Sequence, residues 1–368
     1  MKKVLSTLLC VVLLITCCLA VTSCGKDSGK KTFEIAVVTD VGQLMDGGFN
    51  QGTYEGAKEY AEANNLTYKY YQPANGSDAS DNDRIAAMRQ AVNNGAKVIV
   101  TPGFLQATAI ETVAKEHPEV KFIFVDGWTL KLDNVTAIIY KEQECGYMAG
   151  YAVVKDGFTK LGYTGGGGGT NPPCNRYGYG FVQGADAAAK ELGVNVTVKY
   201  SYKYGDSFSA SSELQTQIAS WYAAGTEAVF SCGGSMLASV KSAAAEYPSA
   251  KIVGVDTDQA KESTQIITSA MKALANSIKR VLGQYYDNKW DAELANKSQN
   301  LGAAEDATGL PTAKDSWRFT KFTVEEYNTL FKSIADGTIV PDGTVPENAN
   351  DGAWLQKNLT NTTIEFEK

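Results

Sequence analysis

Two stretches of the chain, KVIVTPGF at residues 97–104 and KFIFVDG at residues 121–127, have the composition of buried strands that end in a tight turn. Both are rich in apolar, β-branched or aromatic residues, and both change to proline or glycine at their ends, which predicts strands at 97–101 and 121–125. The segments 50–63 and 83–94, which precede them, have helical spacing of apolar residues. Strands that alternate with helices in this way favour an α/β protein with a parallel sheet.

The same pattern recurs through the rest of the chain. It predicts further strands at 33–39, 66–71, 135–140, 161–164, 196–200, 228–231 and 252–255, and further helices at 177–192, 209–224 and 236–247. One architecture is therefore repeated twice. The length of 368 residues is typical of two domains of about 150 residues each.

The ends of two pairs of predicted strands match closely. Gly103 and Asp126 are 23 positions apart, and Gly234 and Asp256 are 22 positions apart. Because open α/β sheets bind ligands at the carboxyl ends of their strands, two such edges would each present one carboxylate to a shared cleft. The alternative is that each aspartate only caps a helix or forms a turn.

The charge balance excludes some classes of function. The chain has 34 Lys and Arg against 41 Asp and Glu, a net charge of −7, so binding to nucleic acid is not expected. A single histidine, His117, argues against catalytic triads and multi-histidine metal sites. We expect no catalytic residue, no metal and no cofactor.

The first 24 residues have the features of an export signal. Lys2 and Lys3 are followed by an uncharged, mostly apolar run, and small residues precede Cys24. This ending resembles the lipobox of bacterial lipoproteins, in which the cysteine is acylated. We therefore expect a signal peptide at 1–23, a tether at 24–32 and a lipid anchor on Cys24 that holds the protein at the extracytoplasmic face of the cell membrane. The alternative is a permanent anchor helix.

Cysteine usage predicts buried thiols in the body of the chain. Three cysteines lie there, an odd number without CxxC spacing, which defines neither a disulfide framework nor a zinc site. They are Cys145, Cys174 and Cys232, and the other four lie in the leader: Cys10, Cys17, Cys18 and Cys24.

A run of five glycines at 165–169 suggests a phosphate-binding loop at first sight. No Gly-Lys-Ser/Thr follows it, and five glycines match GxGxxG trivially. A tight turn that leaves backbone free to approach a ligand is the preferred interpretation.

After the first predicted strand the chain reads VVTDVG at residues 37–42, DGGFNQ at 46–51 and YEG at 54–56. This resembles the basic membrane protein (BMP) family of lipoproteins, whose purine-nucleoside-receptor-like members are substrate-binding proteins of ABC importers. The usual family motifs are TDxG, DKSFNQ and WEG. Gly47-Gly48 replaces Lys-Ser and Tyr54 replaces Trp, while Phe-Asn-Gln is intact.

The similarity continues in order along the chain and covers about residues 33–368. Its further segments are Gly103-Phe104, Val125-Asp126, Pro173, 176–181, Gly233-Gly234, 254–259, Thr268-Ser269 and Lys272. The resemblance implies a type I periplasmic-binding-protein fold, with two Rossmann-like lobes of parallel sheet joined by a hinge that the chain crosses several times. It implies lobe 1 at 33–141 plus 258–295 and lobe 2 at 142–257 plus 296–368.

The resemblance also implies a set of ligand-binding residues. Phe49 and Tyr177 would sandwich a nucleoside base. Asp126 and Asp256 would accept hydrogen bonds from the ribose, and Lys272 would donate one while offsetting both carboxylates. The remaining expected contacts are Asp40 and Asn50 at the base edge and Gly234 through its backbone. The structural alternatives are that Phe49 and Tyr177 are core aromatics and that Lys272, at the start of a helical segment, is a solvated charge.

The expected function is capture of a nucleoside, with a purine nucleoside as the expected ligand, by lobe closure, and the closed form would be recognised by an ABC permease with its ATPase. The protein would act as a monomer and would not be an enzyme. Three alternatives stay open: a protein of the same fold that binds a sugar or small signalling molecule, a surface nucleoside hydrolase that uses Asp126 and Asp256, and a surface antigen or adhesin.

Overall fold

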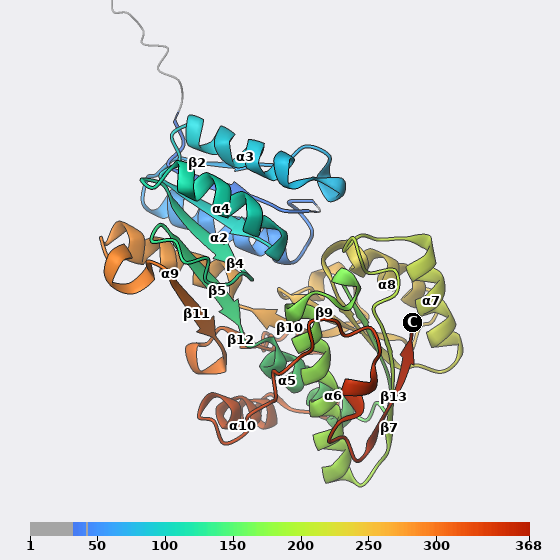
Figure 1. Cartoon of the computed structure of the whole chain (residues 1–368). Helices are drawn as coiled ribbons and strands as arrows, with labels where there is room; N and C mark the ends of the chain where they lie inside the picture. Colours follow the sequence, from blue (N-terminus) through green and yellow to red (C-terminus); the bar gives the residue numbers. More distant parts are fainter. Residues whose placement is uncertain (1–31, 42) are drawn as a thin grey trace, which may run out of the picture. The chain divides into compact units, whose positions relative to one another are not determined.

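Two β-sheets form the framework of residues 32–41 and 43–368, which are the part of the chain that this computed structural model describes (Figure 1). The first has six strands in the order β11-β5-β4-β3-β1-β2, all parallel. Its strands are β1 (Ile35–Val38), β2 (Tyr68–Tyr71), β3 (Val98–Pro102), β4 (Lys121–Val125), β5 (Val135–Tyr140) and β11 (Lys297–Leu301).

The second sheet has seven strands in the order β12-β10-β9-β8-β6-β7-β13. Its pairs are parallel except for the short antiparallel pair of β10 with β12. The strands are β6 (Lys160–Gly165), β7 (Val196–Ser201), β8 (Ala228–Cys232), β9 (Lys251–Asp256), β10 (Ile266–Lys272), β12 (Thr308–Gly309) and β13 (Thr362–Glu367). The α/β fold class predicted from the sequence is confirmed.

Helices cover both faces of the six-stranded sheet because its strands are buried on both sides. On β1, Ile35 and Val37 face one cluster, while Ala36 and Val38 face the other. The first cluster includes α2 (Phe49–Ala63) and α9 (Leu274–Tyr286), and the second includes α3 (Asp81–Asn93) and α4 (Ala107–Glu116). This two-sided burial explains the continuous apolar runs in the sequence.

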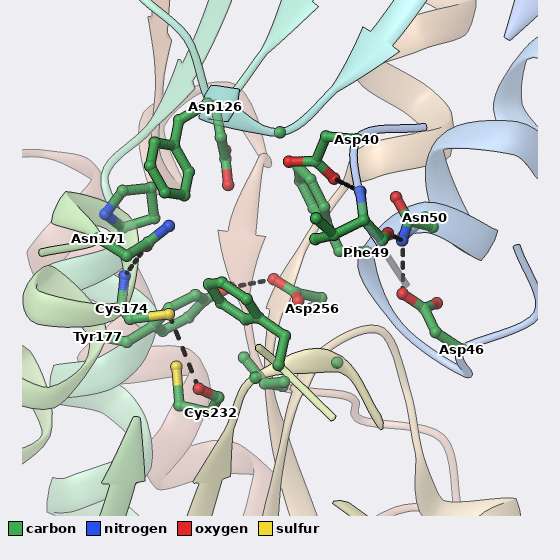
Figure 2. A pocket seen from close by; sticks show the side chains of 18 of the residues that line it. Asp40, Asp46, Phe49, Asn50, Asp126, Asn171, Cys174, Tyr177, Cys232 and Asp256 are labelled. Carbon is green, nitrogen blue, oxygen red and sulfur yellow. Dashed lines mark hydrogen bonds between the residues drawn. The ribbon is translucent and has the colours of Figure 1, made fainter. Parts of the chain in front are cut away.

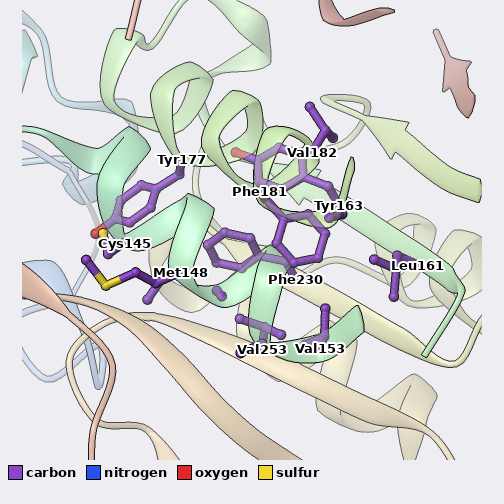
Figure 3. Packing of buried hydrophobic residues seen from close by; sticks show 14 of the residues in the cluster. Cys145, Met148, Val153, Leu161, Tyr163, Tyr177, Phe181, Val182, Phe230 and Val253 are labelled. Carbon is purple, nitrogen blue, oxygen red and sulfur yellow. The ribbon is translucent and has the colours of Figure 1, made fainter. Parts of the chain in front are cut away.

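The seven-stranded sheet is covered in the same way. Its larger cluster joins the sheet to α5 (Glu142–Lys155), α6 (Pro172–Leu192) and α10 (Val324–Ala335), and the opposite face packs on α7 (Ser212–Ala223) and α8 (Leu237–Ala244). Figure 3 shows Met148 and Val153 of α5 and Phe181 of α6 gathered around Phe230 of β8. The sequence analysis did not predict α4, α5 or α10, and it expected the helical segment that contains α9 (Leu274–Tyr286) to begin at Lys272.

Glycines allow α5 and α6 to touch backbone to backbone. A Cβ on Gly150 would lie 1.9 Å from the carbonyl oxygen of Phe181, and one on Gly184 would lie 1.9 Å from that of Tyr147. Cβ atoms on Gly146 and Gly180 would lie 2.3 Å and 2.2 Å from carbonyl oxygens of the facing helix. Each helix therefore carries a pair of glycines four residues apart on its contact face, which fixes its position against the other helix.

The strand order differs from the expected lobe boundaries at two places. β10 was expected in lobe 1, as part of 258–295, but it belongs to the seven-stranded sheet. β11 was expected in lobe 2, as part of 296–368, but it pairs with β5 in the six-stranded sheet. The chain thus crosses between the sheets after Lys272 and after Leu301, because strand pairing and not local sequence assigns these segments.

Residues 33–368 form one compact unit. The signal peptide expected at 1–23, Cys24 and the tether up to residue 31 lie outside the described residues. Among residues 32–41 and 43–368, no helix combines the length and apolar character needed to cross a membrane.

Candidate functional site

A cavity of about 680 Å³ lies at the carboxyl ends of strands from both sheets. All eight residues that the sequence analysis selected line it, and they come from β9, β10, α2, α6 and the turns after β1, β4 and β8. Its walls are formed by Asp40, Val41, Asp46, Phe49, Asn50, Gly103, Phe104, Asp126, Asn171, Pro173, Cys174, Tyr177, Phe208, Cys232, Gly233, Gly234, Ser235, Val255, Asp256 and Lys272.

The two aspartates occupy equivalent positions in the two sheets. Asp126 follows β4 directly and Asp256 ends β9, and both have left-handed backbone, with φ of 56° and 65°. Aspartate tolerates this conformation better than most residues. Figure 2 shows both carboxylates on the cavity, as the paired spacing in the sequence predicted.

Lys272 links these carboxylates at the end of β10. Its Nζ atom lies 2.6 Å from Asp126 Oδ2, 3.1 Å from Glu142 Oε1 and 3.8 Å from Asp256 Oδ1. Its side chain is 1% exposed. Lys272 is therefore neither at the start of a helix nor a solvated charge, since α9 begins two residues later at Leu274.

Glu142 and Arg176 complete the buried charge cluster, and the sequence analysis missed this role for both. Glu142 is fully buried at the start of α5, and its Oε2 atom accepts a hydrogen bond of 2.5 Å from Nε of Arg176 on α6. The close contact of α5 with α6 brings the two side chains together. No local signal in the sequence connects residues 34 positions apart.

The cluster controls the ionisation of its members. Burial would lower the pKa of Lys272, but Asp126, Glu142 and Asp256 raise it well above its ordinary value. Burial likewise opposes ionisation of Glu142, yet Arg176 and Lys272 lower its pKa. Burial raises the pKa of Asp126, and it raises the pKa of Asp256 to about 7, although Lys272 opposes both shifts.

Among the cluster residues that line the cavity, Asp126 has one carboxylate oxygen available to a ligand. Asp126 Oδ1 is buried, and no donor among residues 32–41 and 43–368 hydrogen-bonds to it. A buried carboxylate oxygen without a partner is costly. The arrangement can therefore accept a hydrogen bond from a hydroxyl or N–H group in the cavity.

A second polar group lies where the chain leaves β1. Asp40 Oδ1 accepts a hydrogen bond of 2.6 Å from the N–H of Val41, and Asn50 Nδ2 donates to the carbonyl of Val41. Glycine is required at position 103, beside Asp40, because a Cβ there would lie 1.8 Å from Asp40 Oδ2. Asn50 Oδ1 is buried and has no hydrogen-bond donor within the described part of the chain.

The loop after β1 is tied to α2 and to the other sheet. The carboxylate of Asp46 accepts hydrogen bonds from the N–H groups of Gly48, Asn50 and Gln51, which satisfies the N-terminus of α2. The carbonyl of Gly47 accepts hydrogen bonds from Thr257 and Gln259, which follow β9. These contacts join the two sides of the cavity.

The aromatic residues differ from the expectation in one respect. Phe49 is half-buried and its ring centroid lies 5.2 Å from Lys272 Nζ, but Tyr177 is only 2% exposed. The Tyr177 ring packs edge-on against Phe230, and its hydroxyl donates to Asp256 Oδ1 at 3.0 Å (Figure 2). Tyr177 thus presents its hydroxyl end to the site, while its ring belongs to the core.

Two phenylalanines that the sequence analysis did not select also line the cavity. Phe104 and Phe208 are both half-buried. Phe104 follows Gly103, so its position after the end of a strand could have identified it as a residue that lines the cavity. Phe208 lies in an irregular segment with φ of 56°, which no sequence pattern predicts.

The glycine run 165–169 forms a tight turn, with left-handed backbone at Gly167, Gly168 and Gly169. It does not line the cavity. The space beside it is filled by side chains, because a Cβ on Gly166 would meet the Phe208 ring at 2.3 Å. The cysteine prediction is confirmed, since Cys145, Cys174 and Cys232 are buried free thiols.

Asp40 leads to a prediction about stability and pH. Burial raises the pKa of Asp40 to about 7, well above the ordinary aspartate value of 3.8. The folded state therefore holds a proton that the unfolded state releases between these values, so stability decreases as pH rises through this window. We expect the free energy of unfolding of the wild type, relative to Asp40→Asn, to fall by on the order of 3–4 kcal/mol between pH 4 and pH 8.

Denaturant unfolding of both proteins at several pH values measures this difference. Asp83→Asn is the control with the opposite sign, because Ser80 lowers the pKa of the Asp83 carboxyl. The wild type should gain stability relative to that variant as pH rises. A constant difference for Asp40→Asn would contradict the prediction.

Comparisons with known proteins agree with this architecture. Residues 33–343 match the Bmp family, described as PnrA-like ABC transporter substrate-binding proteins. The chain is 28% identical over 283 residues to the ABC transporter nucleoside-binding protein BmpA of Lactococcus lactis, covering 71% of this chain and 77% of that protein. It is 29% identical over 345 residues to a CD4+ T-cell-stimulating antigen of Listeria innocua, covering 86% and 90%.

The fold also matches a solved structure. An ABC transporter solute-binding protein from Conexibacter woesei superposes with a TM-score of 0.67 at 19% identity, covering 86% of this chain and all of that one. The expected type I periplasmic-binding-protein fold is confirmed. The chain belongs to the Bmp family of PnrA-like ABC transporter substrate-binding proteins.

Proposed function

We propose that the cavity binds a nucleoside, with the ribose at the buried charge cluster and the base between aromatic rings. The observation that carries the proposal is the unpartnered Oδ1 atom of Asp126, beside Lys272 and facing the same cavity as Asp256. Vicinal ribose hydroxyls are donors that suit two neighbouring carboxylates. The name of the Lactococcus relative, a nucleoside-binding protein, supports the same ligand class.

The base would lie against Phe49 and Phe208 in this proposal. Both line the cavity and are half-buried, whereas the Tyr177 ring is buried in the core. Asp40 and Asn50 would contact the base edge, since the Asn50 Oδ1 atom is buried without a donor among the described residues. Backbone at Gly234, with φ of 45°, would allow the ligand close approach.

The proposed setting is the extracytoplasmic face of the cell membrane. The lipobox-like ending at Cys24 supports a lipid anchor, and the family supports an ABC permease and its ATPase as partners. The protein would act as a non-enzymatic monomer. Closure of the two sheets around the ligand would supply the form that the permease recognises.

Calorimetric titration with adenosine, guanosine, inosine and uridine tests the proposal. A ligand of about 19 heavy atoms at roughly 0.3–0.5 kcal/mol per atom predicts a Kd between about 50 nM and 40 µM. The 5′-monophosphates should bind at least about 100-fold more weakly, because Lys272 is the one cationic side chain among the described lining residues and three carboxylates surround it.

Two variants make the test specific to the cavity. Phe208→Ala should weaken nucleoside binding by roughly 10- to 100-fold through loss of stacking. Tyr204→Ala, on the same segment but 40% exposed and outside the cavity, should leave it unchanged. No heat from any nucleoside, with folded protein, would overturn the proposal, and heat from a sugar or release of free base would favour the alternatives.

A further inference from the structure

Two thiols share one wall of the cavity. Cys174 is the third residue of α6 and Cys232 is the last residue of β8, and both line the cavity as free cysteines. The Cys174 Sγ atom lies 3.7 Å from the carbonyl oxygen of Cys232. Figure 2 shows the two sulfur atoms close together beside Tyr177.

We propose that Cys174 and Cys232 are an oxidation site of this protein and form a reversible disulfide in the wall of the ligand cavity. The proposal is independent of the ligand, because it depends only on the contact between the two side chains. Cys145 provides the contrast within the same protein. It is fully buried in the same hydrophobic cluster but does not line the cavity.

The positions of the two thiols suggest different roles. Cys174 lies in the first turn of a 21-residue helix and is 7% exposed, so a small oxidant in the cavity reaches it more readily than Cys232, which is 1% exposed. Burial raises the pKa of Cys232 well above its ordinary value. Cys174 is therefore the thiol that attacks the oxidant. Cys232 is the thiol that then attacks the oxidised Cys174 sulfur and forms the disulfide.

A hydroperoxide supplies the oxidising equivalents. The Cys174 thiolate attacks one peroxide oxygen, so that an S–O bond forms, the O–O bond breaks and hydroxide leaves. The Cys232 sulfur then attacks the Cys174 sulfur, so that the S–S bond forms and the S–O bond breaks, and the Cys232 proton leaves with the oxygen as water. In total, two thiols and one hydrogen peroxide give one disulfide and two waters, and each sulfur loses one electron.

Local backbone can accommodate the bond. An S–S bond of about 2.05 Å requires the sulfur atoms to approach one another. Cys232 is followed by Gly233 and Gly234, which have the conformational freedom to follow this movement. Both glycines line the cavity, so the disulfide would change its wall. An extracytoplasmic protein also works where disulfides persist.

The test is treatment of the full-length, ligand-free protein with hydrogen peroxide, followed by alkylation of free thiols and peptide mapping without reduction. We expect a Cys174–Cys232 linked peptide in most molecules, reversed by dithiothreitol, with Cys145 recovered as a free thiol. In Cys232→Ser, the link should be absent and dimedone should label Cys174. Cys145→Ser should form the link as the wild type does.

Circular dichroism of each variant establishes that it is folded. Recovery of both Cys174 and Cys232 as free thiols, under conditions that oxidise dithiothreitol, would overturn the proposal, as would a link to Cys145 instead. The measurement contains no nucleoside. A protein that forms the disulfide but binds no nucleoside would therefore retain this site and refute only the proposed function.

Discussion

Replacement of Lys272 by methionine is expected to lower the free energy of unfolding by about 3–5 kcal/mol and to weaken nucleoside binding by at least about 100-fold. The lysine is the shared partner of Asp126, Glu142 and Asp256, and its side chain is 1% exposed. Methionine fills similar space but leaves buried carboxylates without their cation. Removal of one partner from a buried ion pair costs more than the pair contributes.

The loss of stability should depend on pH. Without Lys272 the carboxylates of Asp126 and Asp256 lose the cation that lowers their pKa. Their raised pKa values mean that the folded variant holds protons which the unfolded chain releases, so its stability falls further as pH rises. The difference in free energy of unfolding between Lys272→Met and the wild type, measured by denaturant unfolding, should therefore be larger at pH 8 than at pH 5.

Lys279→Met is the matched control. Lys279 also pairs with a glutamate, Glu59, at 2.7 Å, but its side chain is 37% exposed. An ion pair at the surface is worth at most about 1 kcal/mol. If the two lysine variants lost the same stability, or if Lys272→Met bound nucleosides normally, the role assigned to the buried cluster would be wrong.

Gly184→Ala is expected to destabilise the protein by about 3 kcal/mol or more, although alanine is the better helix former. A Cβ at this position on α6 would lie 1.9 Å from the carbonyl oxygen of Tyr147 on α5. The obstacle is backbone, so the helices must separate. Because α5 carries Glu142 and α6 carries Arg176, the variant should also weaken ligand binding.

Gly283→Ala tests whether the effect arises from the helix contact or from the substitution itself. Gly283 is also inside a helix, α9, but the nearest atom to its Cβ would be in the Tyr60 ring at 3.9 Å. We expect that variant to gain up to about 1 kcal/mol from helix propensity. Thermal and denaturant unfolding of both variants gives the comparison, and equal effects would refute the explanation.

Local sequence was sufficient to predict the type and the bounds of an element where neighbouring elements bury it. β4 and β5 have the predicted bounds because apolar, β-branched runs suit strands covered on both faces. The matched spacing of Gly103 with Asp126 and of Gly234 with Asp256 placed both carboxylates on one cavity, since parallel strands end at the same edge. The family motifs added Asp40, Phe49, Asn50, Tyr177 and Lys272, which also line the cavity.

Strand pairing determined the segments that the local pattern or the family resemblance assigned wrongly. The stretch around Lys272 resembles the start of an alanine-rich helix, yet β10 pairs with β9 on one side and β12 on the other. Hydrogen bonds to two neighbouring strands outweigh the weak preference of this sequence. The same reason places β11 beside β5.

The sequence by itself determined the α/β class, the repeated architecture, the family and eight of the residues that line the cavity. Only the tertiary structure decided that the Tyr177 ring lies in the core, that Phe208 lines the cavity, and that Glu142 and Arg176 complete the cluster of Lys272. These depend on contacts between residues far apart in the chain. Propensity and spacing describe neighbours along the backbone, whereas burial and charge pairing depend on which surfaces meet after folding.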